Sequence, residues 1–351
     1  MKKRHNVENN VKKFYKMVKN GQVVFDNPIQ RDDNQWSLQQ KSKLIKSILV
    51  DYSIPPVYSV GVQNDENKEM VYSILDGKQR LTTLCQFIDN EFNLTAIENI
   101  EFEGRNYNLK GLKFEDLEVE LQDCILDYSL SMVYYVFLSE DELIEMFDLL
   151  NNGTPLSRQQ KANARMGMIA AQRMSELKKH AFFTFNAALP TTKHVKDLDS
   201  EVITQTMMII DPTHDLKSFG SREMTKYSES IRNNKEYLFD ELEEILDYVH
   251  VSLDFYTDKL VLKKTIIPMI LAIGKLAKEQ NLDPDLFLEW VNEFKLSIEN
   301  RGKIKINFRE YMGQGSFSKN KLHGRLNTAK RHYMIFCQNH KFTVTDGFVK
   351  E

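Results

Sequence analysis

The sequence has few of the residues that interrupt regular structure, and few that bind zinc or form disulfides. Its 351 residues include 14 glycines, 8 prolines and 3 cysteines. A low content of glycine and proline favours long helices over a sandwich of many short strands. Cys85, Cys124 and Cys337 lie far apart and form no Cys-x-x-Cys pair, so we expect neither a zinc knuckle nor a disulfide framework.

The sequence also lacks long apolar runs and an excess of positive charge. Its first six residues, Met-Lys-Lys-Arg-His-Asn, begin no apolar segment of the signal-peptide type, and no apolar run is long enough to cross a membrane. We therefore expect a cytoplasmic protein with no membrane partner. The formal net charge is −3, which gives no overall basic field, so any contact with DNA must come from a local patch.

What is present favours a folded protein with strands in its first part. Hydrophobic residues make up 42% of the chain and charged residues 28%, a balance that allows a sizeable core, and the length suggests two domains. Val57–Val62 and Met70–Leu75 predict one hairpin, and Ile100–Leu109 predicts a second. The continuous apolar run Ser131–Leu138 is typical of a central strand.

Helical patterns lie among these strands and dominate the rest of the chain. Residues 6–19 and 114–128 predict amphipathic helices, and Ser37 with a glutamine three residues later predicts a capping box. From residue 156 onward almost only helical periods follow, and they cover residues 159–179, 200–210, 228–253, 260–279 and 283–298. We therefore predict an α+β fold, with a mixed domain over 1–138 and a helical domain over 139–351.

The most informative motif lies where a strand is expected to turn into a helix. The apolar strand before Asp76 ends there, Gly77 permits positive φ and a tight turn, and Arg80 lies on the first helical turn. A helix start offers free backbone N–H groups, and a guanidinium can fork onto a phosphate, so the junction can hold an anion. From spacing alone, an ordinary capped helix with an Asp76–Arg80 ion pair is the favoured interpretation.

Two further stretches could present polar groups to a ligand. Gln30 and Arg31 follow a proline and precede Trp36, which could stack on a base or pack on the next helix. Residues 151–157, Asn-Asn-Gly-Thr-Pro-Leu-Ser, could form a second anion-binding loop, although such a sequence is more often a helix–helix connection.

A basic segment near the C-terminus is the one expected nucleic-acid footprint. Residues 301–331 carry nine lysines and arginines against one acid, Glu310, with Tyr311 and Phe317 among them. The alternative is a solvated face that balances the acidic helices. The candidate DNA-binding residues are Arg309, Lys319, Lys321, Arg325 and Arg331. The histidines form no metal-binding motif, so no metal ligands are predicted.

The order of these motifs resembles that of a known family. A proline with Gln-Arg and a tryptophan comes first, then a helix ending in Ile-Pro-Pro, then Asp-Gly-x-Gln-Arg-Leu-Thr-Thr-Leu, then Leu-Asn-x-Gly-Thr-Pro-Leu-Ser. This series, from about Phe25 to Arg165, is similar to the N-terminal domain family of GmrSD-type modification-dependent restriction enzymes, which is related to the ParB/sulfiredoxin-like fold. Its most specific block departs only at Lys78, where the family often has glutamine.

The resemblance implies nucleotide binding and, as in several members, hydrolysis of a nucleoside triphosphate (NTP) of unspecified base. Asp76 and Arg80 would be catalytic, and Mg²⁺ would bridge the phosphates and Asp76 or water. The nucleotide-binding residues that it implies are Gln30, Arg31, Asp76, Gly77, Lys78, Gln79, Arg80, Asn151, Gly153 and Thr154.

Many restriction members continue into a His-containing nuclease domain, which this sequence does not show, so we do not expect it to cleave DNA alone. We expect an NTP-binding and NTP-hydrolysing protein of restriction or anti-phage type, whose nucleotide state controls DNA engagement and which works with a separate nuclease or effector subunit. The alternative is a non-enzymatic DNA-binding or partner-recruiting ParB-like module. A nuclease built on the N-terminal domain itself would need a metal cluster, for which the sequence offers only Asp76 and scattered acids.

Overall fold

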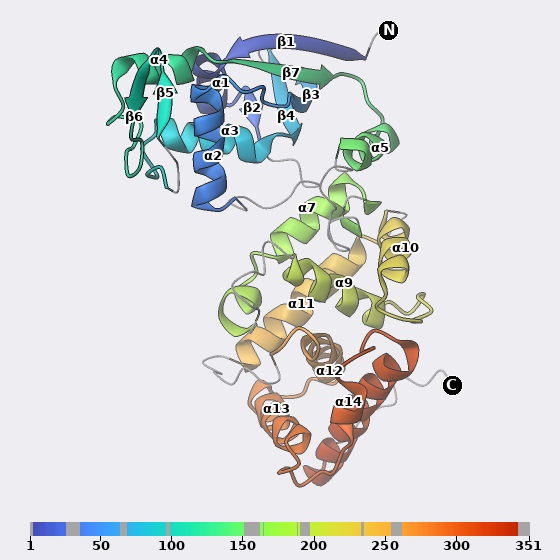
Figure 1. Ribbon diagram of the computed structural model, residues 1–351. Coiled ribbons are helices and arrows are strands. Elements are labelled where there is room, and N and C mark those ends of the chain that lie inside the picture. Colours follow the sequence, from blue (N-terminus) through green and yellow to red (C-terminus); the bar gives the residue numbers. More distant parts are fainter. Residues whose placement is uncertain are drawn as a thin grey trace. The chain divides into compact units, whose positions relative to one another are not determined.

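Two units, residues 1–155 and 156–351, divide the chain in this computed structural model (Figure 1). Each has its own apolar core, and each is described by itself. The helix over residues 140–150 belongs to the first unit, whereas the sequence-based division assigns those residues to the helical domain. The structure describes residues 3–25, 36–63, 69–95, 99–150, 162–163, 165–187, 189, 197–232, 235–253 and 262–342.

A mixed five-stranded sheet organises the first unit, with the strand order β1-β7-β3-β4-β2. β1 is antiparallel to β7, β7 is parallel to β3, β3 is antiparallel to β4, and β4 is parallel to β2. The strands are β1 (Arg4–Asn10), β2 (Val23–Val24), β3 (Val57–Gln63), β4 (Met70–Asp76) and β7 (Ser129–Tyr135). The structure thus confirms the first predicted hairpin as β3–β4 and places β7 inside the sheet, as its apolar sequence predicts.

Four helices cover one face of this sheet and bury an apolar core against it (Figure 1). They are α1 (Val11–Lys19), α2 (Leu38–Leu49), α3 (Lys78–Ile88) and α4 (Val119–Asp127). A separate hairpin, β5 (Ile100–Phe102) and β6 (Arg105–Tyr107), confirms the second predicted turn. Helix α5 (Glu140–Leu150) begins with acids and packs against β4.

Two predicted helices are longer in the sequence pattern than in the structure. The helix expected over 6–19 begins at Val11, because Arg4–Asn10 pairs with β7 instead and the Asn10 side chain caps the helix by accepting from the Lys13 N–H. The helix expected over 114–128 begins at Val119, because the preceding residues form turns of their own, such as Leu117 N–H to Phe114 O.

Other helix boundaries follow the predicted capping chemistry. Ser37 caps α2 in a full capping box with Gln40. In such a box each side chain accepts from the other residue's backbone N–H, which satisfies two donors that the helix itself leaves open. Ser139 and Glu142 form the same pair of contacts at the start of α5, at 3.3 and 2.8 Å.

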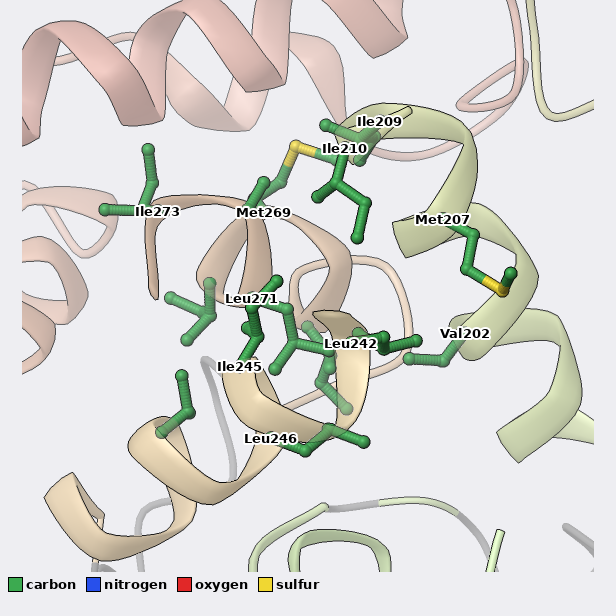
Figure 2. Packing of buried hydrophobic residues seen from close by; sticks show 14 of the residues in the cluster. Val202, Met207, Ile209, Ile210, Leu242, Ile245, Leu246, Met269, Leu271 and Ile273 are labelled. Atoms are coloured by element: carbon green, nitrogen blue, oxygen red, sulfur yellow. The ribbon is translucent and has the colours of Figure 1, made fainter. Parts of the chain in front are cut away.

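Helices make up the second unit, as predicted. α9 and α12 are buried on nearly every side, and α11 packs on both, so that Val202, Leu242 and Leu271 meet in one core (Figure 2). The elements are α7 (Met168–Leu177), the π-helix η2 (Phe182–Asn186), α9 (Leu198–Ile210), α10 (Ser221–Ile231), α11 (Tyr237–Ser252), α12 (Ile267–Glu279), α13 (Pro284–Ile298), the 3₁₀-helix η3 (Phe308–Tyr311) and α14 (Lys319–Asn339).

Three of the predicted helices in this unit are shorter or divided in the structure. The helix expected over 228–253 is split between α10 and α11, and the one expected over 260–279 starts only at Ile267, where Pro268 occupies the first turn. Of the stretch expected over 159–179, the described helix α7 covers its last part. No helix in the described ranges combines the length and the apolar composition that a bilayer crossing requires.

Candidate functional site

The junction between β4 and α3 is built as the motif predicts. Asp76 is the last residue of β4, Gly77 follows with φ of +98°, and α3 begins at Lys78. The N-cap of α3 is therefore a glycine, which has no side chain to accept from the first N–H groups of the helix. The first N–H groups of a helix have no partner within the helix itself, so a helix start of this kind can take part in anion binding.

Arg80 folds back from the first turn of α3 onto the end of β4. Its Nη2 donates to Asp76 Oδ2 at 2.6 Å and to the carbonyl of Pro56 at 3.1 Å. The Arg80 side chain is 14% exposed, whereas the Asp76 side chain is 40% exposed. The arginine thus fixes the carboxylate from the protein side, and the carboxylate reaches the surface.

Gly77 leaves the space that this arginine occupies. A Cβ atom at residue 77 would lie 3.0 Å from Arg80 Nη2 and 3.1 Å from the Val57 side chain. The position needs glycine for two reasons, because its φ lies in the left-handed region and its α-carbon is covered by the guanidinium. The tight turn at Gly77 and the Asp76–Arg80 ion pair therefore depend on each other.

The remaining donors of Arg80 differ in their surroundings. Arg80 Nε is buried and has no hydrogen-bond partner among the described residues. Nη1 also lacks a hydrogen bond to any described residue, but it is not fully buried. The guanidinium can therefore hold Asp76 through one nitrogen and still offer another.

The neighbouring residues of the motif have different positions. Lys78 donates from Nζ to the carbonyl of Phe25 at 3.1 Å, which links the start of α3 to the end of β2, and Gln79 is half-buried on the first turn. Asp76, Gly77, Lys78, Gln79 and Arg80 are thus brought together at one junction. The other predicted nucleotide-binding residues, Gln30, Arg31, Asn151, Gly153 and Thr154, lie outside the described residues.

The carbonyl groups of Pro56 and Phe25 are the contacts that sequence reasoning missed. Both are backbone acceptors, and a backbone acceptor has no signature in a one-dimensional pattern. The Pro55-Pro56 pair before β3 was the available signal, because a proline-fixed segment next to a strand can place a carbonyl reproducibly.

The predicted DNA-binding residues fall into two groups. Arg309, Lys319 and Arg331 are exposed. Lys321 donates to the carbonyls of Met312 and Gln314 at 3.2 and 2.7 Å, so it holds the loop before α14.

Arg325 has a structural position instead of an exposed one. It is 2% exposed and donates to the Tyr311 carbonyl at 2.9 Å, and burial lowers the pKa of its guanidinium. A phosphate cannot reach a side chain that is buried in this way, so we leave Arg325 out of the proposed DNA contacts. The basic cluster in the sequence did not show that Arg325 lies on the inward-facing side of its helix.

One comparison with known proteins gives a match, which covers nearly all of the first unit and the beginning of the second. The model of the GmrSD restriction endonuclease N-terminal domain matches residues 11–167 and so includes the β4–α3 junction. The exposed residues Arg309, Lys319 and Arg331 lie outside the match. Comparisons with curated proteins and with solved structures give no match. The resemblance noted from the motifs is thereby confirmed, and residues 11–167 of this chain belong to the family of GmrSD restriction endonuclease N-terminal domains.

Proposed function

We propose that the GmrSD-type domain binds and hydrolyses a nucleoside triphosphate at the β4–α3 junction, and that its nucleotide state controls engagement of DNA. One observation carries the proposal: the Asp76 carboxylate is fixed by Arg80 directly beside the start of α3, which has no capping side chain. The family match supports a restriction-related role for the domain.

The phosphate would lie at the first turn of α3. The start of a helix is a site where the helix dipole favours negative charge. Arg80 Nη1 would add a charged donor from the side. Phosphoryl transfer depends mainly on positioning and on charge stabilisation, and these groups supply both.

Asp76 would act on the reacting phosphate or on the attacking water. Its Oδ2 is held by Arg80, and Oδ1 is the oxygen left for a water molecule or a cation. Mg²⁺ is commonly bound through one or two carboxylates together with substrate phosphates, so a single exposed carboxylate fits it. When bound, Mg²⁺ would neutralise charge that develops on the phosphates.

Nucleotide binding and turnover of ATP, GTP, CTP and UTP test the proposal. We expect Asp76→Asn and Arg80→Ala to lower kcat by about 10²-fold or more, as loss of one preorganised charge-stabilising group does. The controls are Asp123→Asn and Arg105→Ala, two exposed residues of the same unit outside the junction. A wild-type protein that neither binds nor hydrolyses any of the four would end the proposal.

A second candidate function is a non-enzymatic module that binds DNA or recruits a nuclease or effector subunit. The exposed Arg309, Lys319 and Arg331 favour it, because they lie outside the GmrSD-type domain. In this case DNA affinity would survive Arg80→Ala and fall steeply with salt, since each phosphate contact contributes about −0.9 to the slope of log K against log salt. A flat salt response would exclude this candidate.

A further inference from the structure

A pocket of about 300 Å³ lies at the other end of β4, away from the junction. It opens between α1 and the sheet. Tyr72 of β4 lines it, four residues before Asp76, which in a strand is a separation on the order of 13 Å. The pocket is therefore distinct from the proposed phosphate site. Its lining residues are Val7, Asn9, Lys13, Met17, Gln22, Glu69, Met70, Tyr72 and Met132.

Asn9 is the feature that points to a ligand. It is 7% exposed, and its carboxamide makes no hydrogen bond to any described residue. Asn9 lies on the inner face of β1 opposite the buried Leu130 and lines the pocket, so its amide is reached from the pocket side. An amide that makes no hydrogen bond within the described protein keeps both its donor and its acceptor groups for a molecule in the pocket. A ligand in the pocket would supply the missing partners.

The walls of the pocket favour a flat ring. Met17, Met70 and Met132 line it, and thioethers contact aromatic rings favourably. The Tyr72 ring is fixed by an edge-on contact with Tyr134 at 5.1 Å between centroids. The volume is at the lower end of the range for small-molecule pockets, about 300–1,000 Å³, which suits a single base with its sugar.

The polar groups favour an adenine base and a phosphate. Carboxamides of the Asn and Gln type pair with the N6/N7 edge of adenine through two hydrogen bonds, and Asn9 and Gln22 both line the pocket. Lys13 at its edge and Lys16 one turn later are exposed and form no ion pair with any described residue. Together they provide positive charge where a phosphate would emerge.

We propose that this pocket binds an adenine nucleotide, with Asn9 reading the base and Lys13 contacting the phosphate. The nucleotide can be free or can belong to a nucleic-acid strand, since both carry the same base and phosphate. The site does not depend on hydrolysis at the junction.

Titration calorimetry of the full chain with adenosine, AMP and a single-stranded oligo-dA tests this. We expect the wild type to bind AMP or the oligonucleotide and Asn9→Leu to weaken that binding at least tenfold while its Tm is kept or raised. Lys13→Met, on the exposed side of α1, should weaken AMP more than adenosine without changing the fold. Asn6→Leu, on the outer face of the same strand, is the matched control.

The binding results either support the proposed pocket or overturn it. Binding of AMP that Asn9→Leu and Lys13→Met reduce, and Asp76→Asn does not, supports the pocket with a free nucleotide. The same dependence seen only with oligo-dA identifies the strand as the source. No binding of any probe, equal effects of Asn9→Leu and Asn6→Leu, or loss of AMP binding in Asp76→Asn alone would overturn the pocket. The last outcome would leave the junction proposal intact.

Discussion

At the scale of single residues, Gly77 is where backbone conformation and the Asp76–Arg80 ion pair depend on one another. We expect Gly77→Ala to destabilise unit 1 by about 2–3 kcal/mol, because alanine in the left-handed region costs about 1–2 kcal/mol and its Cβ would also displace Arg80. Gly111→Ala is the control, since Gly111 has φ of +87° and nothing within 4 Å of its would-be Cβ. If urea unfolding shows that Gly77→Ala and Gly111→Ala lose the same stability, the contact with Arg80 adds nothing to the cost at residue 77.

His332 is a second residue whose surroundings give a measurable consequence. It is fully buried, Trp290 Nε1 donates to its Nδ1 at 3.1 Å, and its Nε2 lies 3.0 Å from Ser297 Oγ. Because Trp290 can only donate, His332 is neutral and carries its proton on Nε2. Burial lowers the pKa of His332 to about 4.

The stability of the protein should therefore fall as the pH drops from about 6.5 to 4. In that window the unfolded chain binds a proton at His332 and the native chain does not, so the native state loses about 3 kcal/mol, at 1.36 kcal/mol per unit. Urea unfolding of wild type and His332→Phe at pH 7 and pH 4.5 measures it. The wild type should lose more stability than the variant over this range, and His340→Gln, a surface control, should behave as the wild type.

At the scale of elements, Gly324 lets α14 approach η3. A Cβ atom at residue 324 would overlap the ring of Tyr311, and Arg325 holds the Tyr311 carbonyl from the next position of the helix. Alanine gains about 1 kcal/mol of helix propensity over glycine, whereas overpacking costs about 1–3 kcal/mol.

We expect the overlap to prevail, so Gly324→Ala should lower the free energy of unfolding by up to about 2 kcal/mol. In a Tyr311→Leu background, where the ring is absent, the same change should become neutral or stabilising. Denaturant unfolding of the four proteins of this double-mutant cycle gives the answer, and additive effects would contradict the proposed contact.

Elements defined by local chemistry were predictable from the sequence. The capping box at Ser37, the hairpin β3–β4 and the Asp76–Arg80 ion pair each depend on residues close in sequence. The strand β1 was not predictable, because its pairing partner β7 lies more than 100 residues away and the helical pattern of α1 extends over it. Local periodicity cannot show which of two competing partners a segment will find.

The candidate site also has some features that the sequence predicted and others that it did not. The junction of Asp76, Gly77 and Arg80 follows from sequence, and the ion pair that the simpler interpretation expected is present. Its role toward a phosphate stays a prediction. The anchoring of Arg80 to the Pro56 carbonyl and the burial of Arg325 depend on tertiary packing, and spacing has no information about either.

At the scale of the whole molecule, two separate cores predict two unfolding events. The core of unit 1 and that of unit 2 share no residue. The chain has two tryptophans, Trp36 in the first unit and Trp290 in the second, so Trp36→Phe leaves a reporter for the second unit alone. Phe87 is fully buried in the first core.

We expect Phe87→Ala to lower the stability of unit 1 by about 3–5 kcal/mol and to leave the Trp290 fluorescence transition unchanged. Circular dichroism, which reports both units, should then show an earlier first transition, and residues 1–155 expressed alone should unfold cooperatively. If Phe87→Ala shifts the Trp290 transition as much as it shifts the transition of unit 1, the two units unfold together.

The pairing of β1 with β7 has a consequence for how the chain is made. Arg4–Asn10 leaves the ribosome about 120 residues or more before its register partners Ser129–Tyr135. At about 5–20 residues per second, synthesis leaves that strand unpaired for roughly 6–25 s. Folding of the first unit therefore waits for its last strand, and the nascent chain is open to chaperones or to wrong strand partners during that interval.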